Sequence, residues 1–113
     1  MLPLKNRLKK ERDIKKVFRQ GWGVKEESLL LKKIENSLKE SRFCFVVPDS
    51  VSKKATIRNR LRRKMREIAR NALPEIKKGF DVVLIALPGA EKKDFRQLKI
   101  ELSRIFLKAN LFK

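Results

Sequence analysis

The segment from Ala55 to Ala72 constrains the fold more than any other, because it carries a single apolar stripe at helical spacing. Its apolar residues recur at steps of three or four positions, which puts them on one side of an α-helix. They are Ile57, Leu61, Met65, Ile68 and Ala72. A helix with one apolar face must bury that face against another element. The rest of the chain is therefore expected to supply a sheet or further helices that cover this stripe.

The remaining sides of the same helix are almost entirely cationic. Between Ala55 and Arg70, seven Arg or Lys residues stand against the single acid Glu67. They are Arg58, Arg60, Arg62, Arg63, Lys64, Arg66 and Arg70. Like charges four residues apart destabilise a free helix, and a phosphate backbone would neutralise them. The alternative, a solvated surface of a charge-rich thermophilic protein, normally adds Glu together with Lys.

The whole chain shows the same imbalance of charge. Its 113 residues contain 31 Lys and Arg against 13 Asp and Glu, a formal net charge of +18. Such an excess favours a polyanionic partner, and nucleic acid is the obvious one. The length predicts one domain over residues 1–113, in which residues 1–6 form a flexible basic tail. No stretch approaches the roughly 20 apolar residues of a membrane span, so no membrane partner is expected.

The residue types that the chain lacks limit the reactions that it could catalyse. The chain has no His and no Tyr, so it lacks the usual acid–base group near neutral pH and the commonest transition-metal ligand. Asp13 and Asp81 are too far apart in the sequence to be nominated as an acid–base pair. No catalytic residue and no metal ligand is therefore predicted. Cys44 is the single cysteine, expected to be a small buried strand residue, and the N-terminus lacks a signal peptide's apolar core; both favour a reduced, cytoplasmic protein.

Periodicity and turn signals predict the other elements. They are a helix over 8–20, strands over 28–35 and 41–47, a strand over 80–87 and a helix over 92–110, with room for a short strand over 51–56. The two early strands are close enough for an antiparallel hairpin, and Asp94 with Gln97 is spaced as a capping box. The predicted fold class is α+β, a small two-layer sandwich of helix, strand, strand, (strand), helix, strand and helix around one mixed sheet.

The central helix also resembles a known signature. Residues 52–67 read Ser-Lys-Lys-Ala-Thr-Ile-Arg-Asn-Arg-Leu-Arg-Arg-Lys-Met-Arg-Glu. This segment resembles the signature helix of the protein subunit of bacterial ribonuclease P, in which an Ala is followed by an Arg-Asn-basic triplet, an aliphatic residue and further basic residues. Residues 5–10 and 79–83 are similar to the first helix and the late buried strand of the same family. The likeness covers essentially the whole chain, in order.

The resemblance implies a protein that joins a large catalytic RNA and helps it remove the 5′ leader from precursor tRNA. In that family the RNA carries the bond-breaking chemistry and its magnesium ions, and the protein alone holds no cofactor. The implied complex contains one catalytic RNA and one protein monomer, it binds precursor tRNA, and DNA is not expected as a partner. The residues implied to bind the catalytic RNA are Arg58, Asn59, Arg60, Arg62, Arg63, Lys64 and Arg66.

In this family a cleft between the first helix and the sheet holds the leader. The residues implied to bind the leader here are Arg12, Ile14, Lys15, Phe18, Lys53 and Lys54. Ile14 stands where the family often has an aromatic residue, so leader binding is expected to depend more on cations and apolar contact. Spacing and composition alone favour a core position for Phe18, whereas the resemblance favours leader binding, and the role of Trp22 stays open. The predicted core phenylalanines are Phe43, Phe45, Phe80, Phe95 and Phe106, with the alternative that one of the strand pair faces the cleft.

Other classes of function remain as alternatives. A structural RNA-binding protein of the ribosomal type shares the size, charge and basic helix, but has no preference for leader-bearing tRNA. A DNA-binding protein would place the helix in a major groove. With only Asn59 as a base reader, however, the pattern favours backbone contacts. A stand-alone nuclease would need grouped catalytic side chains, which this sequence does not offer.

Overall fold

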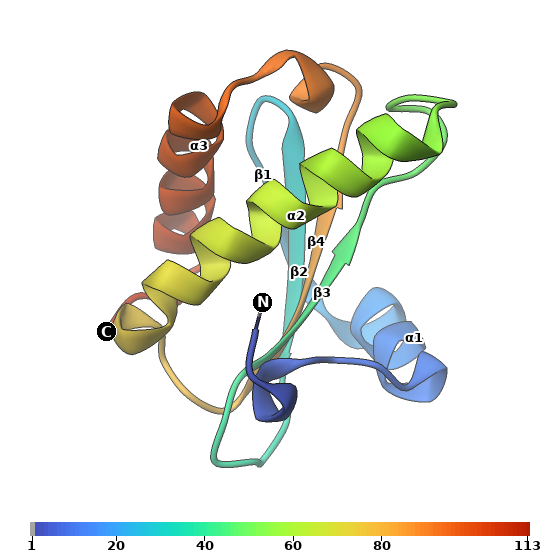
Figure 1. The fold of residues 1–113 in the computed structure, drawn as a ribbon. Helices are drawn as coiled ribbons and strands as arrows, with labels where there is room; N and C mark the ends of the chain where they lie inside the picture. The colour runs from blue at the N-terminus through green and yellow to red at the C-terminus, as the bar shows by residue number, and fades with distance from the viewer. Residues whose placement is uncertain (1) are drawn as a thin grey trace.

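The computed structural model describes residues 2–113 (Figure 1). Within them, three α-helices and four strands form one unit with three short 3-10 turns. In chain order the helices and strands are α1 (Glu11–Gln20), β1 (Trp22–Lys25), β2 (Leu29–Glu35), β3 (Arg42–Val46), α2 (Ala55–Ala72), β4 (Phe80–Ala86) and α3 (Phe95–Lys108). The 3-10 turns are Leu4–Asn6, Leu73–Glu75 and Ala90–Lys92. The predicted α+β class, with one mixed sheet, is confirmed.

The helices cover the two faces of the sheet unequally. Helices α2 and α3 lie on one face, where Leu31, Met65 and Leu102 belong to the main hydrophobic core (Figure 1). Helix α1 lies on the other face, where Val17 packs against Val83 in a second, smaller cluster. The sandwich is thus formed by the sheet with α2 and α3, and α1 is added on the opposite face.

The strand order differs from the sequence prediction. It is β1-β2-β4-β3, so β2 and β3 do not form the predicted hairpin. Strand β4 lies between them, antiparallel to β2 and parallel to β3. Apart from Asp81 its residues are apolar, and a strand of that composition is best buried inside the sheet with both faces covered. Helix α2 supplies the crossover that a parallel pair requires.

The fourth strand also lies elsewhere than predicted. Residues 48–51 form a turn in which the Val51 N–H donates to the Pro48 carbonyl over 3.0 Å, and residues 52–54 lead from it, without a strand, into α2 at Ala55. The additional strand is instead β1, which pairs antiparallel with β2 at the edge of the sheet. Trp22 and Val24 alternate with Gly23 and Lys25, but the run is only four residues long and contains a glycine, which weakens a strand signal, and no strand was predicted there.

The N-terminal residues are packed and do not form the predicted flexible tail. Leu2 and Asn6 are both buried. The Asn6 side-chain amide donates to the Ser41 carbonyl over 2.9 Å, and the Leu8 N–H donates to the Phe43 carbonyl over 2.9 Å. These bonds hold the segment along the open edge of β3, so α1 begins only at Glu11. Met1, which belongs to the same prediction, lies outside the described residues.

Helix α3 begins with the predicted capping box. The Gln97 N–H donates to the Asp94 carboxylate over 2.8 Å, and the Asp94 N–H donates to the Gln97 side chain over 2.9 Å. The helix starts directly after this cap, so Phe95 lies in its first turn, before the buried face begins at Leu98. Phe95 is exposed, and its predicted core position is wrong. The other predicted core phenylalanines are buried at Phe43, Phe45 and Phe106 and half-buried at Phe80.

A buried carboxylate on β4 connects the sheet to α1. Asp81 accepts hydrogen bonds from Arg42 Nε and Nη2, over 2.8 and 2.7 Å, and from the Asn36 amide over 2.9 Å. The Asp81 hydrogen bonds raise the pKa of Arg42. The same guanidinium lies 3.5 Å from Asp13 of α1. Asp13 and Asp81, distant in the sequence, therefore meet at one arginine as partners in an ion-pair network.

A second buried carboxylate connects α3 to the loop between β1 and β2. Glu101 accepts hydrogen bonds from the Ser28 N–H over 2.6 Å and the Ser28 hydroxyl over 2.7 Å, and it pairs with Lys93. Burial would raise the pKa of Glu101, but the hydrogen bonds from Lys93 and Ser28 outweigh it, so that pKa is lowered. Both clusters satisfy their charges inside the fold.

Candidate nucleic-acid interface

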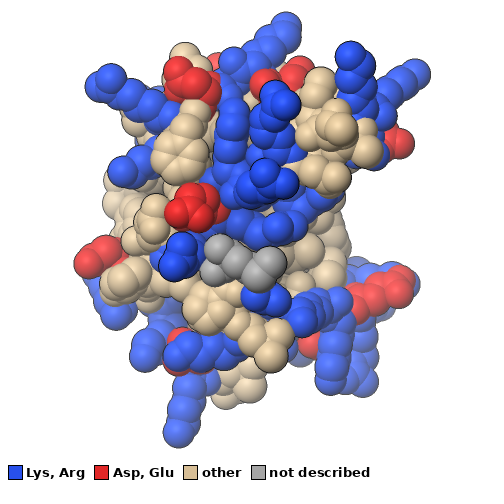
Figure 2. Space-filling model, viewed as in Figure 1, with Lys and Arg blue, Asp and Glu red and all other residues tan. Residues whose placement is uncertain are grey.

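Helix α2 presents its cations away from the core. Leu61, Met65 and Ile68 are buried, as the apolar stripe predicts. Arg60 and Arg63 are exposed, and the other cations of residues 58–66 are half-exposed. The helix crosses the front of the sheet, and Lys and Arg side chains cover much of this face of the molecule (Figure 2). A ligand could reach these side chains without any rearrangement of the core.

Few carboxylates neutralise this face. Arg58 donates to the Ser52 carbonyl over 2.9 Å and lies 3.5 Å from the highly exposed Asp49. Arg62 donates to the Asn59 side chain over 2.7 Å, so Asn59 orients a neighbouring guanidinium. Five cations of α2 have no carboxylate within 4.0 Å among residues 2–113; they are Arg60, Arg62, Arg63, Lys64 and Arg66. The positive charge of this surface is not balanced by carboxylates of the same fold, so the surface is suited to bind phosphate.

On α1, the two residues proposed to face the leader differ in burial. Ile14 packs against the smaller hydrophobic cluster, whereas Phe18 keeps 40% of its surface exposed. The ammonium group of Lys32 lies 5.7 Å from the centre of the Phe18 ring and donates to the Phe18 carbonyl over 3.2 Å. Phe18 is therefore not a core residue. Lys32 was missed by the sequence analysis, since nothing in a strand's local pattern connects it to a helix fourteen residues away.

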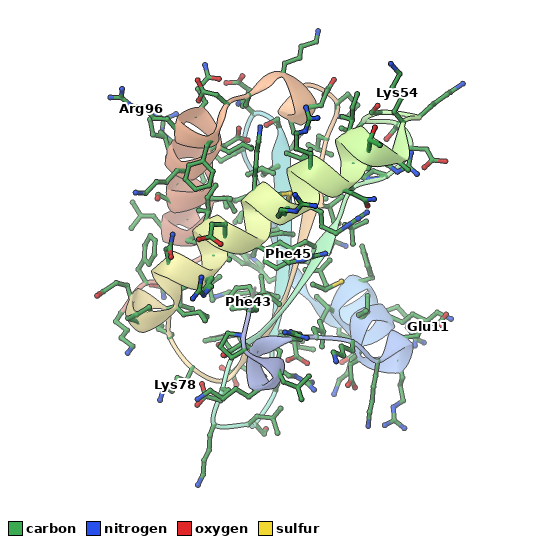
Figure 3. The ribbon with its side chains drawn as sticks, viewed as in Figure 1. Glu11, Phe43, Phe45, Lys54, Lys78 and Arg96 are labelled. Carbon is green, nitrogen blue, oxygen red and sulfur yellow. The ribbon has the colours of Figure 1, made fainter. Side chains whose placement is uncertain are left out.

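The residues implied for leader binding fall into two separate groups. Arg12 and Lys15 are exposed on α1, where Lys15 pairs with Glu11 over 3.0 Å. Lys53 and Lys54 are exposed at the start of α2. Figure 3 shows Lys54 at one end of the molecule and Glu11, the first residue of α1, well away from it. The structure thus does not bring these four cations into one cluster.

A shallow cavity of about 340 Å³ lies beside the open edge of β3. Its floor includes Phe43 and Phe45, which Figure 3 labels, and its rim carries Arg7, Lys9 and Arg66. The complete lining is Leu2, Arg7, Leu8, Lys9, Phe43, Cys44, Phe45 and Arg66. The cavity places Arg66 of α2 beside the segment that precedes α1, but no residue implied for leader binding lines it. Arg7 and Lys9 escaped the sequence analysis, which assigned their segment no site role.

Cys44 is half-buried on β3. Burial raises the pKa of its thiol, and this effect exceeds the opposing influence of Arg62 and Arg66. The thiol is therefore protonated at neutral pH and poorly nucleophilic. Residues 2–113 contain no group of three or more His, Cys, Asp or Glu side chains that could hold a metal ion. In the same residues, no helix is both long and apolar enough to cross a membrane.

A mixed four-stranded sheet that carries an arginine-rich, carboxylate-poor helix defines a small α+β protein built to bind a polyanion. Comparison with known proteins identifies its family. The family model for ribonuclease P matches residues 2–110. The "Ribonuclease P protein component" of Synechocystis sp. is 38% identical over 111 residues, which cover 97% of this chain and 90% of that protein.

Solved structures of ribonuclease P proteins have the same fold as this chain. The "RNase P protein from Thermotoga maritima" has a TM-score of 0.82 at 31% identity, covering 90% of this chain and 96% of that one. The Staphylococcus aureus RNase P protein has a TM-score of 0.88 at 22% identity, covering 96% and 98%, which supports the fold alone. The chain belongs to the ribonuclease P protein family. It is a protein subunit of ribonuclease P, an RNA-binding endoribonuclease complex of tRNA processing, and these findings favour that function over the ribosomal alternative.

Proposed function

We propose that the exposed face of α2 binds the catalytic RNA of ribonuclease P through its phosphate backbone. One observation carries this proposal: the cations of residues 58–66 point away from the core and have almost no carboxylate partners. Repulsion among them costs helix stability, and phosphate contacts would offset that cost. Asn59 contributes by holding Arg62 in place for a phosphate oxygen.

The α1 side of the sheet is the proposed contact for the 5′ leader of precursor tRNA. Phe18 offers a partly exposed ring for base stacking, and Lys32 lies over that ring as a cation for the adjoining phosphate. Ile14 contributes apolar surface beside them, and Arg12 and Lys15 extend the cationic surface along α1. Lys53 and Lys54 would contact RNA at the other end of the molecule.

The chemistry of cleavage is proposed to reside in the RNA, with magnesium bound there. The absence, among residues 2–113, of any group of three or more His, Cys, Asp or Glu side chains that could hold a metal ion supports this placement. The protein's part is to supply affinity and to order the RNA. We further propose one protein monomer for each catalytic RNA, acting in the cytoplasm, where bacterial precursor tRNA is made.

Reconstitution tests this function. The purified protein is added to a bacterial ribonuclease P RNA at low magnesium, and 5′ maturation of precursor tRNA is measured. We expect cleavage to be restored relative to RNA alone, and we expect higher affinity for precursor tRNA than for mature tRNA. The absence of stimulation would contradict the proposal. Cleavage by the protein without RNA would contradict the placement of the active site.

A further inference from the structure

Two adjacent lysines of β2 point to opposite faces of the sheet, as successive strand residues do. Lys32 lies toward α1, over Phe18. Lys33 lies on the opposite face, with its ammonium group 5.6 Å from the centre of the Trp22 ring and 4.6 Å from that of Phe80. Phe80 packs against the main core beneath α2 and α3, so Lys33, Trp22 and Phe80 lie on the face of the sheet that these two helices cover.

The set of Trp22, Lys33 and Phe80, called here the Trp22 platform, combines an exposed ring with an unneutralised cation. Trp22 keeps 54% of its surface exposed although tryptophan is the largest apolar side chain of the fold. Lys33 has no carboxylate within 4.0 Å among residues 2–113. Burial is the largest cause that lowers the pKa of Lys33, and the positive charge of Lys77 is the second. The negative charge of Glu35 has a smaller, opposing effect. An anion beside Lys33 and Lys77 would relieve this repulsion.

Stability alone does not account for the platform. A lysine over an exposed ring contributes about 0.5–1 kcal/mol, which the half-buried Phe80 could provide without Trp22. A tryptophan on the edge strand β1 adds exposed apolar surface that folding does not bury. An exposed ring next to free cations is, in contrast, the arrangement by which proteins hold unpaired nucleotides: the base stacks on the ring and the cation pairs with the phosphate.

We propose that the Trp22 platform is an additional RNA contact, which binds one unpaired nucleotide by stacking its base on Trp22 and pairing its phosphate with Lys33. The proposal rests on the RNA-binding function above, but it adds a site on the face of the sheet opposite to α1. The nucleotide comes either from the catalytic RNA or from the precursor tRNA. Both present the same chemistry.

The intrinsic fluorescence of the unmodified protein tests this directly, because Trp22 is the only tryptophan and the chain has no Tyr. Stacking of a base on the ring should quench and shift its emission. One titration uses the catalytic RNA alone, and a second adds precursor tRNA, with mature tRNA in parallel. Quenching by the catalytic RNA assigns the nucleotide to it, whereas quenching only by precursor tRNA assigns it to the leader. Emission that stays unchanged while filter binding shows saturation would overturn the proposal and leave the proposed function intact.

Two neighbouring lysines offer a matched pair of variants. Lys33→Gln and Lys32→Gln remove the same charge from opposite faces of one strand. Each should reduce the slope of log affinity against log salt by about 0.7 if it loses one contact to single-stranded phosphate. Only Lys33→Gln should also diminish the quenching of Trp22. Trp22→Ala should weaken binding of the assigned RNA roughly 5- to 100-fold, and Trp22→Phe should restore part of the loss. Equal loss of the Trp22 signal in both lysine variants would contradict a separate platform.

Discussion

Arginine is held in two opposite ways in this molecule. On β3, Arg42 is bound by Asp81 at 2.7 Å, lies 3.5 Å from Asp13, and sits where it connects a strand to α1. On α2, Arg60 and Arg63 are exposed and have no carboxylate partner among residues 2–113. The same guanidinium chemistry thus stabilises the fold in one region and remains available to phosphate in the other. The comparison indicates that unpaired charge, more than total charge, marks the binding surface.

The largest expected effect is a loss of stability when the ion pair of Arg42 and Asp81 is broken. Asp81→Ala leaves Arg42 and Asn36 without their main partner inside the sheet. Removing one member of a buried ion pair costs several kcal/mol, and the partial exposure of Arg42 reduces the expected loss in unfolding free energy to about 2–3 kcal/mol. Urea denaturation measures it. The double variant Arg42→Met with Asp81→Leu should recover most of the stability, because neither charge is then left unpaired. No loss in the single variant would show that the network does not hold α1.

Acid titration examines the other buried carboxylate. The pKa of Glu101 is lowered in the folded protein from its ordinary value of 4.5. Its contribution to stability is therefore present above that unfolded value and is lost as the pH falls below it, through the folded pKa. The unfolding free energy measured by urea denaturation at several pH values should fall steeply below pH 4.5. Glu101→Gln should be less stable at neutral pH and should show a shallower acid decline. Parallel declines for the two proteins would contradict this.

Phe18→Ala tests an exposed residue on the α1 side. Because Phe18 is only partly buried, the variant should remain folded. Losing one stacked base should weaken binding of leader-bearing tRNA by about 1–2 kcal/mol, or roughly 5- to 30-fold, while mature tRNA binds as before. Equilibrium binding to both forms measures the difference. An equal loss for both forms, or a large loss of stability, would assign Phe18 a structural role.

Arg62→Ala should affect RNA binding and leave stability nearly unchanged. The loss of one phosphate contact should reduce the salt slope of binding to the catalytic RNA by about 0.9. Arg96→Ala on α3 is a matched control, since Arg96 is an exposed arginine on another helix. Its salt slope should stay close to that of the unmodified protein. If the two variants behave alike, the charge of α2 acts only through the overall field of the molecule.

The smallest expected effect concerns the start of α2. Lys54 occupies the N-cap, where no side chain accepts a backbone N–H, and a cation there opposes the helix dipole. Lys54→Asp should raise the unfolding free energy by about 1 kcal/mol and weaken RNA binding. Lys53→Asp makes the same change of charge one residue outside the cap, so it should weaken RNA binding without the gain in stability. A gain in both variants would show that relief of general repulsion, and not capping, is the cause.

Much of α2 could be predicted from the sequence because its determinants are local. The predicted range, Ala55 to Ala72, agrees with the helix observed, and the buried stripe lies where the spacing put it. The capping box of Asp94 and Gln97 is equally local and equally well predicted. For the same reason the family signature, which is confined to one helix, is recognisable in the sequence alone.

The site beyond α2 could be predicted only in part. The sequence makes Phe18 a candidate, but its exposure and its contact with Lys32 depend on where α1 lies on the sheet. The cations at Lys53 and Lys54 are grouped with α1 by resemblance, although the structure separates them. The Trp22 platform has no local signal in the sequence, because Trp22 and Lys33 meet through strand pairing, and Phe80 joins them from a third strand.

The sequence by itself determined the helix, its two faces and the excess of unneutralised charge, since each depends on neighbours within a few positions along the chain. Only the tertiary structure decided that β4 separates β2 from β3, that Arg42 joins Asp13 to Asp81, and that Lys32 and Lys33 serve opposite faces. These outcomes depend on the competition among all strands for the buried centre of one sheet, and no local spacing records which strand occupies it.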